Sequence, residues 1–144
     1  MKQAFIATVT LLALMGCNTA PVKLVDFKDQ PVKHLYNQSI SMQEVQLDVR
    51  MAAEKAGWSA IPGETPGRMT AIRNNGETSA TVEIDFNLNK YSIRYKSSNS
   101  LDYQKGCPGK TADGKIKVEE KCISPTYNEW VTELNKEIAN RLQY

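Results

Sequence analysis

The feature that most limits how this chain can fold is a pair of alternating segments at residues 80–87 and 90–96. Apolar and polar residues alternate in both, which is typical of strands with one buried face. The apolar members are Val82, Ile84 and Phe86 in the first segment and Tyr91, Ile93 and Tyr95 in the second. If Leu88 and Asn89 form a two-residue turn, all six fall on one face. We therefore predict an antiparallel hairpin with one buried and one solvated face.

The polar residues of this hairpin form a charged cluster on the opposite face. The predicted register places Glu83 opposite Arg94 and Asp85 opposite Ser92. Such a set resembles an acid, a base and a nucleophile. An open sheet face, however, provides neither the desolvation that shifts carboxylate pKa values nor a base that activates a serine. We interpret the cluster as solvated cross-strand pairs.

Two amphipathic helices are predicted on either side of the strands. Residues 41–56 begin with a capping box of Ser41 and Glu44 and end before Gly57. Residues 125–142 begin with Pro125 after a Ser124 cap. Further strands are predicted at residues 58–61 and 68–73, followed by an Asn-Gly reversal. Together these elements predict an α+β fold of order α-β-β-β-β-α, a two-layer sandwich with both helices on one face of a four-stranded antiparallel meander.

The start of the chain has the features of an export signal. Lys2 precedes twelve residues, 4–15, that are apolar except for two threonines. Such a run is too short to span a bilayer, which takes about 20 residues, but it fits the apolar region of a secretory signal. The run ends in Leu14-Met15-Gly16-Cys17, which resembles the lipobox of bacterial lipoproteins. An uncleaved helix, or ordinary cleavage beside a free Cys17, is the alternative.

The lipobox resemblance implies cleavage before Cys17 and acylation of its sulfur and new amino group. Two or three acyl chains hold a protein on a membrane far more firmly than one chain does. In the family's sorting rule an Asp after the cysteine favours the inner membrane, whereas this chain has Asn18. The resemblance thus implies the outer membrane, with the protein facing the periplasm.

These features divide the chain into three parts. Residues 1–16 are the predicted signal peptide, residues 17–40 an acylated cysteine and tether, and residues 41–144 a single α+β domain. The tether is interpreted as a spacer that keeps the domain clear of the membrane. The alternative is that its short apolar pieces add an edge strand to the sheet. Because no basic run is interleaved with aromatic residues, we predict no nucleic-acid binding.

The two remaining cysteines, Cys107 and Cys122, are an even pair in an exported chain and predict one disulfide. They would close a hairpin over residues 107–122, with its turn at residues 113–114. No histidine or helix start is placed to make either thiol reactive. No cofactor or metal site is predicted, because the only histidine, His34, has no ligand at a suitable spacing.

Several motifs carry a wider resemblance. Tyr-Ser-Ile-Arg-Tyr at 91–95, Asn-Ser-Leu-Asp-Tyr at 99–103 and Tyr-Asn-Glu-Trp-Val at 127–131 occur in order. They are similar to a group of small proteobacterial lipoproteins of uncharacterised function. The resemblance covers residues 41–142 and implies an envelope lipoprotein with the same α+β order. It supplies no catalytic residue, and it implies that the hairpin at 107–122 is an insertion.

The expected function is a non-enzymatic interaction or accessory role at the cell envelope. The candidate partner surface comprises Asn99, Tyr103, Lys110, Asp113, Lys115 and Lys117. A purely structural hairpin is an equal alternative.

A second hypothesis is a periplasmic binder of a small apolar or glycan ligand in a pocket between helices and sheet. Its lining would be Trp58, Tyr91, Tyr95, Tyr103 and Trp130. An enzyme ranks third, because no catalytic set is evident.

Overall fold

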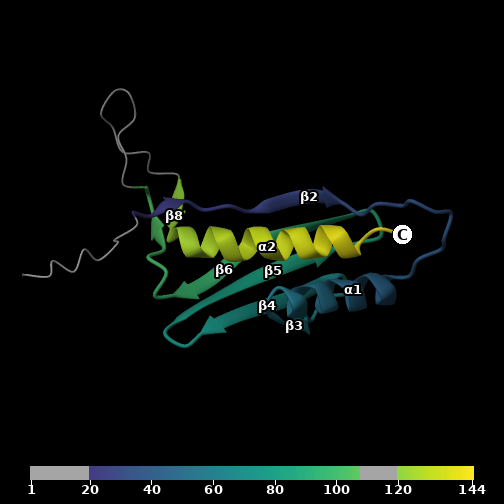
Figure 1. Ribbon diagram of the computed structural model, residues 1–144, viewed down its shortest axis with the longest axis horizontal. Helices are drawn as coiled ribbons and strands as arrows, with labels where there is room; N and C mark the ends of the chain where they lie inside the picture. Colours follow the sequence, from purple (N-terminus) through teal and green to yellow (C-terminus); the bar gives the residue numbers. More distant parts are fainter. Residues whose placement is uncertain (1–19, 108–119) are drawn as a thin grey trace, which may run out of the picture.

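A computed structural model describes residues 20–107 and 120–144, which form an α+β fold of two helices and two antiparallel sheets (Figure 1). The helices are α1 (Met42–Lys55) and α2 (Pro125–Arg141). The strands are β1 (Val22–Lys23), β2 (Phe27–Pro31), β3 (Ser59–Pro62), β4 (Arg68–Asn75), β5 (Thr78–Phe86), β6 (Lys90–Asn99), β7 (Gln104–Lys105) and β8 (Lys121–Ile123).

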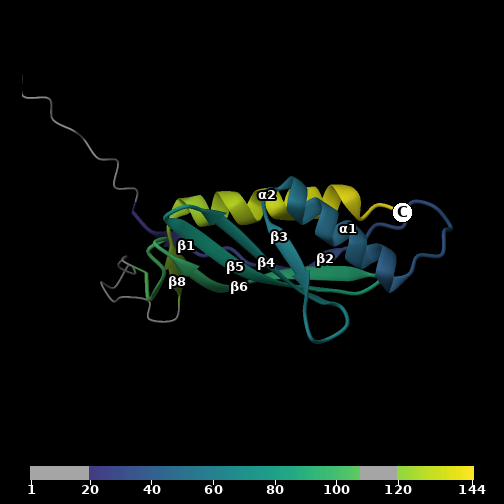
Figure 2. The ribbon, with the colours of Figure 1, turned by 90° about the horizontal axis from the view of Figure 1, so that it is seen from below.

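The larger sheet has five strands in the order β2-β6-β5-β4-β3. Both helices lie on one of its faces, as Figure 2 shows in side view. The helices also contact each other through Arg141, whose Nε donates to Asp48 Oδ1 at 2.8 Å. The helix-facing side of the sheet is therefore the core, and the opposite side is solvated.

The register of β5 and β6 is the one predicted from the alternating residues. Phe86 pairs with Tyr91, Ile84 with Ile93 and Val82 with Tyr95, and a bulge follows between Thr81 and Val82. The turn is closed by Asn87, whose backbone N–H donates to the carbonyl of Lys90 at 2.9 Å. Ile84 and Ile93 are completely buried. The hairpin prediction is confirmed in both register and burial.

The helix limits also agree closely with the predictions, with one exception. The capping box of Ser41 and Glu44 is present, with both hydrogen bonds formed. At α2, in contrast, the Ser124 side chain makes no capping hydrogen bond, so that detail of the prediction is wrong. The backbone N–H of Ser124 instead donates to the Leu101 carbonyl at 2.8 Å. Helix α2 thus begins with Pro125, which lacks an N–H to satisfy.

The predicted four-stranded meander with two helices is wrong. The meander β3 to β6 exists, but β2 extends it to five strands, and β1, β7 and β8 form a separate three-stranded sheet in the order β1-β8-β7. The added strands are short and carry no clear alternation. They are held by partners far along the chain, since β2 pairs with β6 and β1 with β8. A local sequence pattern does not encode such pairings.

The interpretation of residues 17–40 as a spacer is also corrected for most of that segment. Leu24 and Val32 are buried in the core. Further on, the Lys33 N–H donates to the Leu142 carbonyl at 3.0 Å, and the Tyr144 N–H returns a bond to the Lys33 carbonyl at 2.8 Å. From Val22 onward the segment therefore belongs to the folded domain. The predicted signal peptide and Cys17 lie outside the described residues.

Gly67 offers a test of the turn that leads into β4. Its φ is +78°, and a Cβ at this position would lie 2.7 Å from the Phe86 carbonyl oxygen. Gly76 has a similar φ of +74° but open space around it. We expect Gly67→Ala to lower the free energy of unfolding by about 2 kcal/mol or more, and Gly76→Ala by about 1 kcal/mol. Urea unfolding of the two variants measures the difference, and equal losses would contradict the predicted clash.

Candidate functional site

The small sheet β1-β8-β7 forms one end of the molecule. In Figure 1 it lies at the left, beside the first described residues, whereas the C-terminus lies at the opposite end of α2. Strand β8 leads through Ser124 directly into α2. The predicted disulfide and the described part of the predicted partner surface both lie at this end. We therefore treat it as the candidate site.

A disulfide joins Cys107 to Cys122, with 5.2 Å between their Cα atoms. The predicted pairing is confirmed, and Cys122 is buried. Beside it, Gly106 donates its N–H to the Glu120 carbonyl at 2.7 Å, so the two chain segments approach each other as antiparallel neighbours. The disulfide thus fixes the base of the segment between them. Four predicted surface residues lie outside the described residues: Lys110, Asp113, Lys115 and Lys117.

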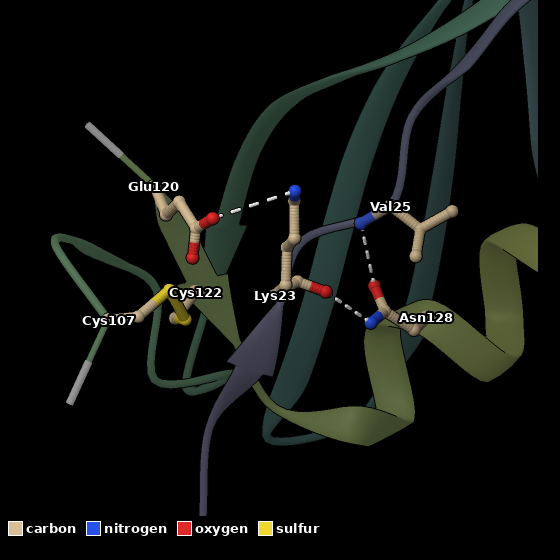
Figure 3. Close-up of a disulfide and its surroundings, with 6 residues drawn as sticks. All are labelled: Lys23, Val25, Cys107, Glu120, Cys122 and Asn128. Carbon is tan, nitrogen blue, oxygen red and sulfur yellow. Dashed lines mark hydrogen bonds and ion pairs between the residues drawn. A yellow bond between two sulfur atoms is a disulfide. The ribbon is translucent and has the colours of Figure 1, made fainter. Parts of the chain in front are cut away.

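Asn128, in the first turns of α2, holds the N-terminal chain against this end (Figure 3). Its Oδ1 accepts from the Val25 N–H at 3.1 Å, and its Nδ2 donates to the Lys23 carbonyl at 2.8 Å. One amide therefore satisfies a donor and an acceptor of the same extended segment. On the same strand, Lys23 Nζ lies 3.7 Å from Glu120 Oε1. These contacts connect β1 to both α2 and the disulfide region.

Sequence reasoning missed the role of Asn128. The available signal was weak, because Asn128 is only a polar residue beside the buried Tyr127 on the apolar stripe of α2. Its two partners are more than a hundred positions earlier in the chain.

The loop from Asn99 to Tyr103 supplies the described part of the predicted partner surface. Asn99 is exposed, and its Nδ2 reaches the Glu77 carbonyl only at 3.5 Å. Leu101 is buried and anchors the loop between Ser100 and Asp102, which both have positive φ. Tyr103 is half-buried and stacks on Tyr95 with 4.5 Å between ring centroids. Asn99 is thus accessible to a partner, whereas most of Tyr103 is used in packing.

The five aromatic residues of the ligand-pocket hypothesis do not gather around one cavity. Tyr95 and Tyr103 stack on each other near β7, and Tyr127 meets Tyr95 edge-on at 5.5 Å. Trp130 instead lies beneath the Arg73 guanidinium, with 4.7 Å between Arg73 Cζ and the centroid of the Trp130 ring. These side chains therefore pack in different parts of the structure.

The buried members of this set contribute to the core. Trp58 and Tyr91 are about as inaccessible as the aliphatic residues around them. The Tyr91 hydroxyl donates to Asn135 Oδ1 at 2.8 Å, and burial raises the pKa of Tyr91 to about 12. It stays protonated at neutral pH and acts as a hydrogen-bond donor from the sheet to α2.

The charged cluster on the solvated face of the sheet is internally paired. Arg94 Nη2 lies 2.5 Å from Glu83 Oε1 and 2.5 Å from Asp85 Oδ2. Arg68 Nε lies 2.6 Å from Asp85 Oδ1, and this hydrogen bond raises the pKa of the Arg68 guanidinium. The register pairs Glu83 with Arg94 as predicted. Each carboxylate faces a guanidinium, so the cluster consists of cross-strand ion pairs on the open face of the sheet.

A hollow of about 400 Å³ adjoins this cluster, between β2 and the β5–β6 turn. The carboxylate of Asp29 lies 2.9 Å from Lys90 Nζ, and hydrogen bonding to that lysine lowers the pKa of Asp29. The Ser92 hydroxyl accepts the Asp29 N–H at 2.9 Å. Asp26 accepts the Tyr95 N–H at 2.9 Å. The hollow therefore contains paired polar groups, with no histidine or cysteine among its lining residues.

Among residues 20–107 and 120–144, no group of three or more histidine, cysteine, aspartate or glutamate side chains could hold a metal ion.

None of the helices in the described ranges has the length and apolar character needed to cross a membrane.

Comparison with protein-family models, curated proteins and solved structures found no match to this chain. The resemblance to small proteobacterial lipoproteins therefore stays a prediction from the motifs.

Asn128 provides a test of how firmly the N-terminal chain is held. Asn128→Ala leaves the Val25 N–H and the Lys23 carbonyl without their protein partner, and we expect a loss of about 2 kcal/mol in the free energy of unfolding. The matched control is Asn140→Ala, an exposed position on the same helix, which we expect to change stability by about 0.5 kcal/mol or less. Both substitutions raise helix propensity equally. Urea unfolding measures both, and equal stabilities would contradict the role of Asn128.

Proposed function

We propose that this protein is a membrane-anchored lipoprotein of the bacterial envelope, attached through Cys17 to the outer membrane and facing the periplasm. The observation that carries the proposal is the sequence Leu14-Met15-Gly16-Cys17 at the end of a short apolar run. Residues 1–16 would be removed, and the new N-terminal cysteine would carry the acyl chains.

The length of chain between the anchor and the fold supports a defined orientation. Strand β1 begins at Val22, five residues after Cys17. Five residues span at most about 18 Å when fully extended. A domain attached through Cys17 would therefore stay close to the membrane, with the small sheet as its nearest end.

The proposed role is non-enzymatic. The carboxylates of the solvated sheet face are paired with arginine or lysine. His34, the only histidine, has its Nε2 2.8 Å from the Leu88 carbonyl and no carboxylate bonded to it among the described residues. These arrangements favour structural roles for the groups that could otherwise move protons.

We propose that the protein binds another envelope protein through Asn99 and the adjoining segment closed by the disulfide. A covalent bond across the base of that segment restricts its conformations, which lowers the ordering cost of binding. A partner bound here would lie close to the membrane surface, as expected for an accessory subunit of a membrane-bound assembly.

Cys17→Ala tests the anchor. We expect the variant to remain unprocessed or to be lost from the membrane fraction, because no thiol is available for acylation. Membrane fractionation and the intact mass of the protein measure both effects. The control is Cys107→Ser, which removes the disulfide and leaves the lipobox unchanged. Processing and attachment of Cys17→Ala equal to those of the control would overturn the proposed anchor.

Photocrosslinking tests the partner surface. A photoreactive residue at the exposed position Asn99 is expected to capture one discrete protein in intact cells, whereas the same residue at Asn140 on α2 captures none. Mass spectrometry of the adduct identifies the partner. Identical adduct patterns at the two positions would contradict a specific surface at Asn99.

A further inference from the structure

Two lysines of the small sheet face each other across neighbouring strands. Lys105 on β7 is paired directly with Lys121 on β8, and both are exposed. Like charges directly opposite each other destabilise a strand pair. Among residues 20–107 and 120–144, neither ammonium group has an ion-pair partner, whereas Lys23 on the adjacent strand lies 3.7 Å from Glu120. This arrangement would be relieved by an external anion.

Of these lysines, Lys121 lies on the strand next to β1, which leads to Cys17, and Lys105 lies on the strand beyond it. The Leu24 N–H donates to the carbonyl of Lys121 at 2.8 Å, which fixes β8 beside the start of the fold. Asn128 holds the same segment from the helix side. Because Val22 is only the fifth residue after Cys17, this end cannot move away from an anchored Cys17 by more than about 18 Å. The C-terminus lies at the far end of α2, a helix about 25 Å long (Figures 1 and 2).

We propose that this end of the small sheet rests on an anionic phospholipid surface, with Lys105 and Lys121 among the phosphate groups of the lipids. The inference rests on the proposed anchor at Cys17, which holds the two lysines at a high effective concentration beside the headgroups. Two lysines bind an anionic membrane only weakly by themselves. In a protein already held on the membrane through Cys17, the two lysines would set the orientation of the domain, whereas the anchor provides the attachment.

The test compares lysine reactivity of the lipidated protein in two kinds of vesicle. The mature protein purified from membranes is placed in vesicles of phosphatidylcholine, or of phosphatidylcholine and phosphatidylglycerol at about 7:3. A water-soluble amine-acylating reagent is added, and mass spectrometry gives a rate for each lysine. Lys33 and Lys136, both exposed and away from the small sheet, are the internal controls.

We expect acylation of Lys105 and Lys121 to be about threefold slower or more with phosphatidylglycerol, and unchanged at the two control lysines. The protection should disappear at about 1 M salt, where the Debye length is about 3 Å. Equal rates in both vesicles would overturn the inference. Rates equally slow without phosphatidylglycerol would also overturn it, because the protein itself would then cover the lysines.

Flotation of the same samples separates this inference from the proposed function. A chain that does not float with either vesicle would overturn the lipid anchor and the inference together. A chain that floats with both vesicles, but shows no selective protection of Lys105 and Lys121, would overturn the inference alone.

Discussion

The antiparallel pairing of β5 with β6 is the constraint on which the rest of this fold depends. Its register places Ile84 opposite Ile93 on the side covered by the helices, and Glu83 opposite Arg94 on the side open to water. A slip of one residue would exchange the two faces, so that charges entered the core and apolar side chains faced solvent. Burial of the apolar face thus selects this register and determines where α1 and α2 pack.

Residues 22–33 are part of the folded domain and do more than connect it to the predicted anchor. It crosses the domain from β1, at the small sheet, to Lys33, which is hydrogen-bonded to the C-terminal Leu142 and Tyr144. Asn128 satisfies the backbone of this segment at one end, and Val32 is buried near the other. A membrane anchor at Cys17 would consequently pull on a part of the chain that is built into the fold. Attachment and orientation would then be coupled.

The candidate site was predictable only in part. The Cys107–Cys122 disulfide followed from the even number of cysteines left after Cys17, and the charge pairing of Glu83 with Arg94 followed from alternation. The hydrogen bonds of Asn128 and the pairing of Lys105 with Lys121 could not be predicted from the sequence, because each depends on which distant segments become neighbours. The positions of Trp58, Tyr91, Tyr95, Tyr103 and Trp130 could not be predicted for the same reason. Amphipathic aromatic side chains suit either a cavity or a core, and packing placed these five in different parts of the molecule.

By itself, the sequence determined the helix and strand segments whose signals are local. The capping box at Ser41, the 3.6-residue stripe of α2 and the two-residue alternation of β5 and β6 depend on neighbouring residues, so they can be read directly from the chain. Only the tertiary structure decided the place of residues 22–31, because strands of two and five residues are stable only when distant partners complete their hydrogen bonds. That long-range pairing turned an expected spacer into two strands, and it leaves only residues 18–21 between Cys17 and the fold.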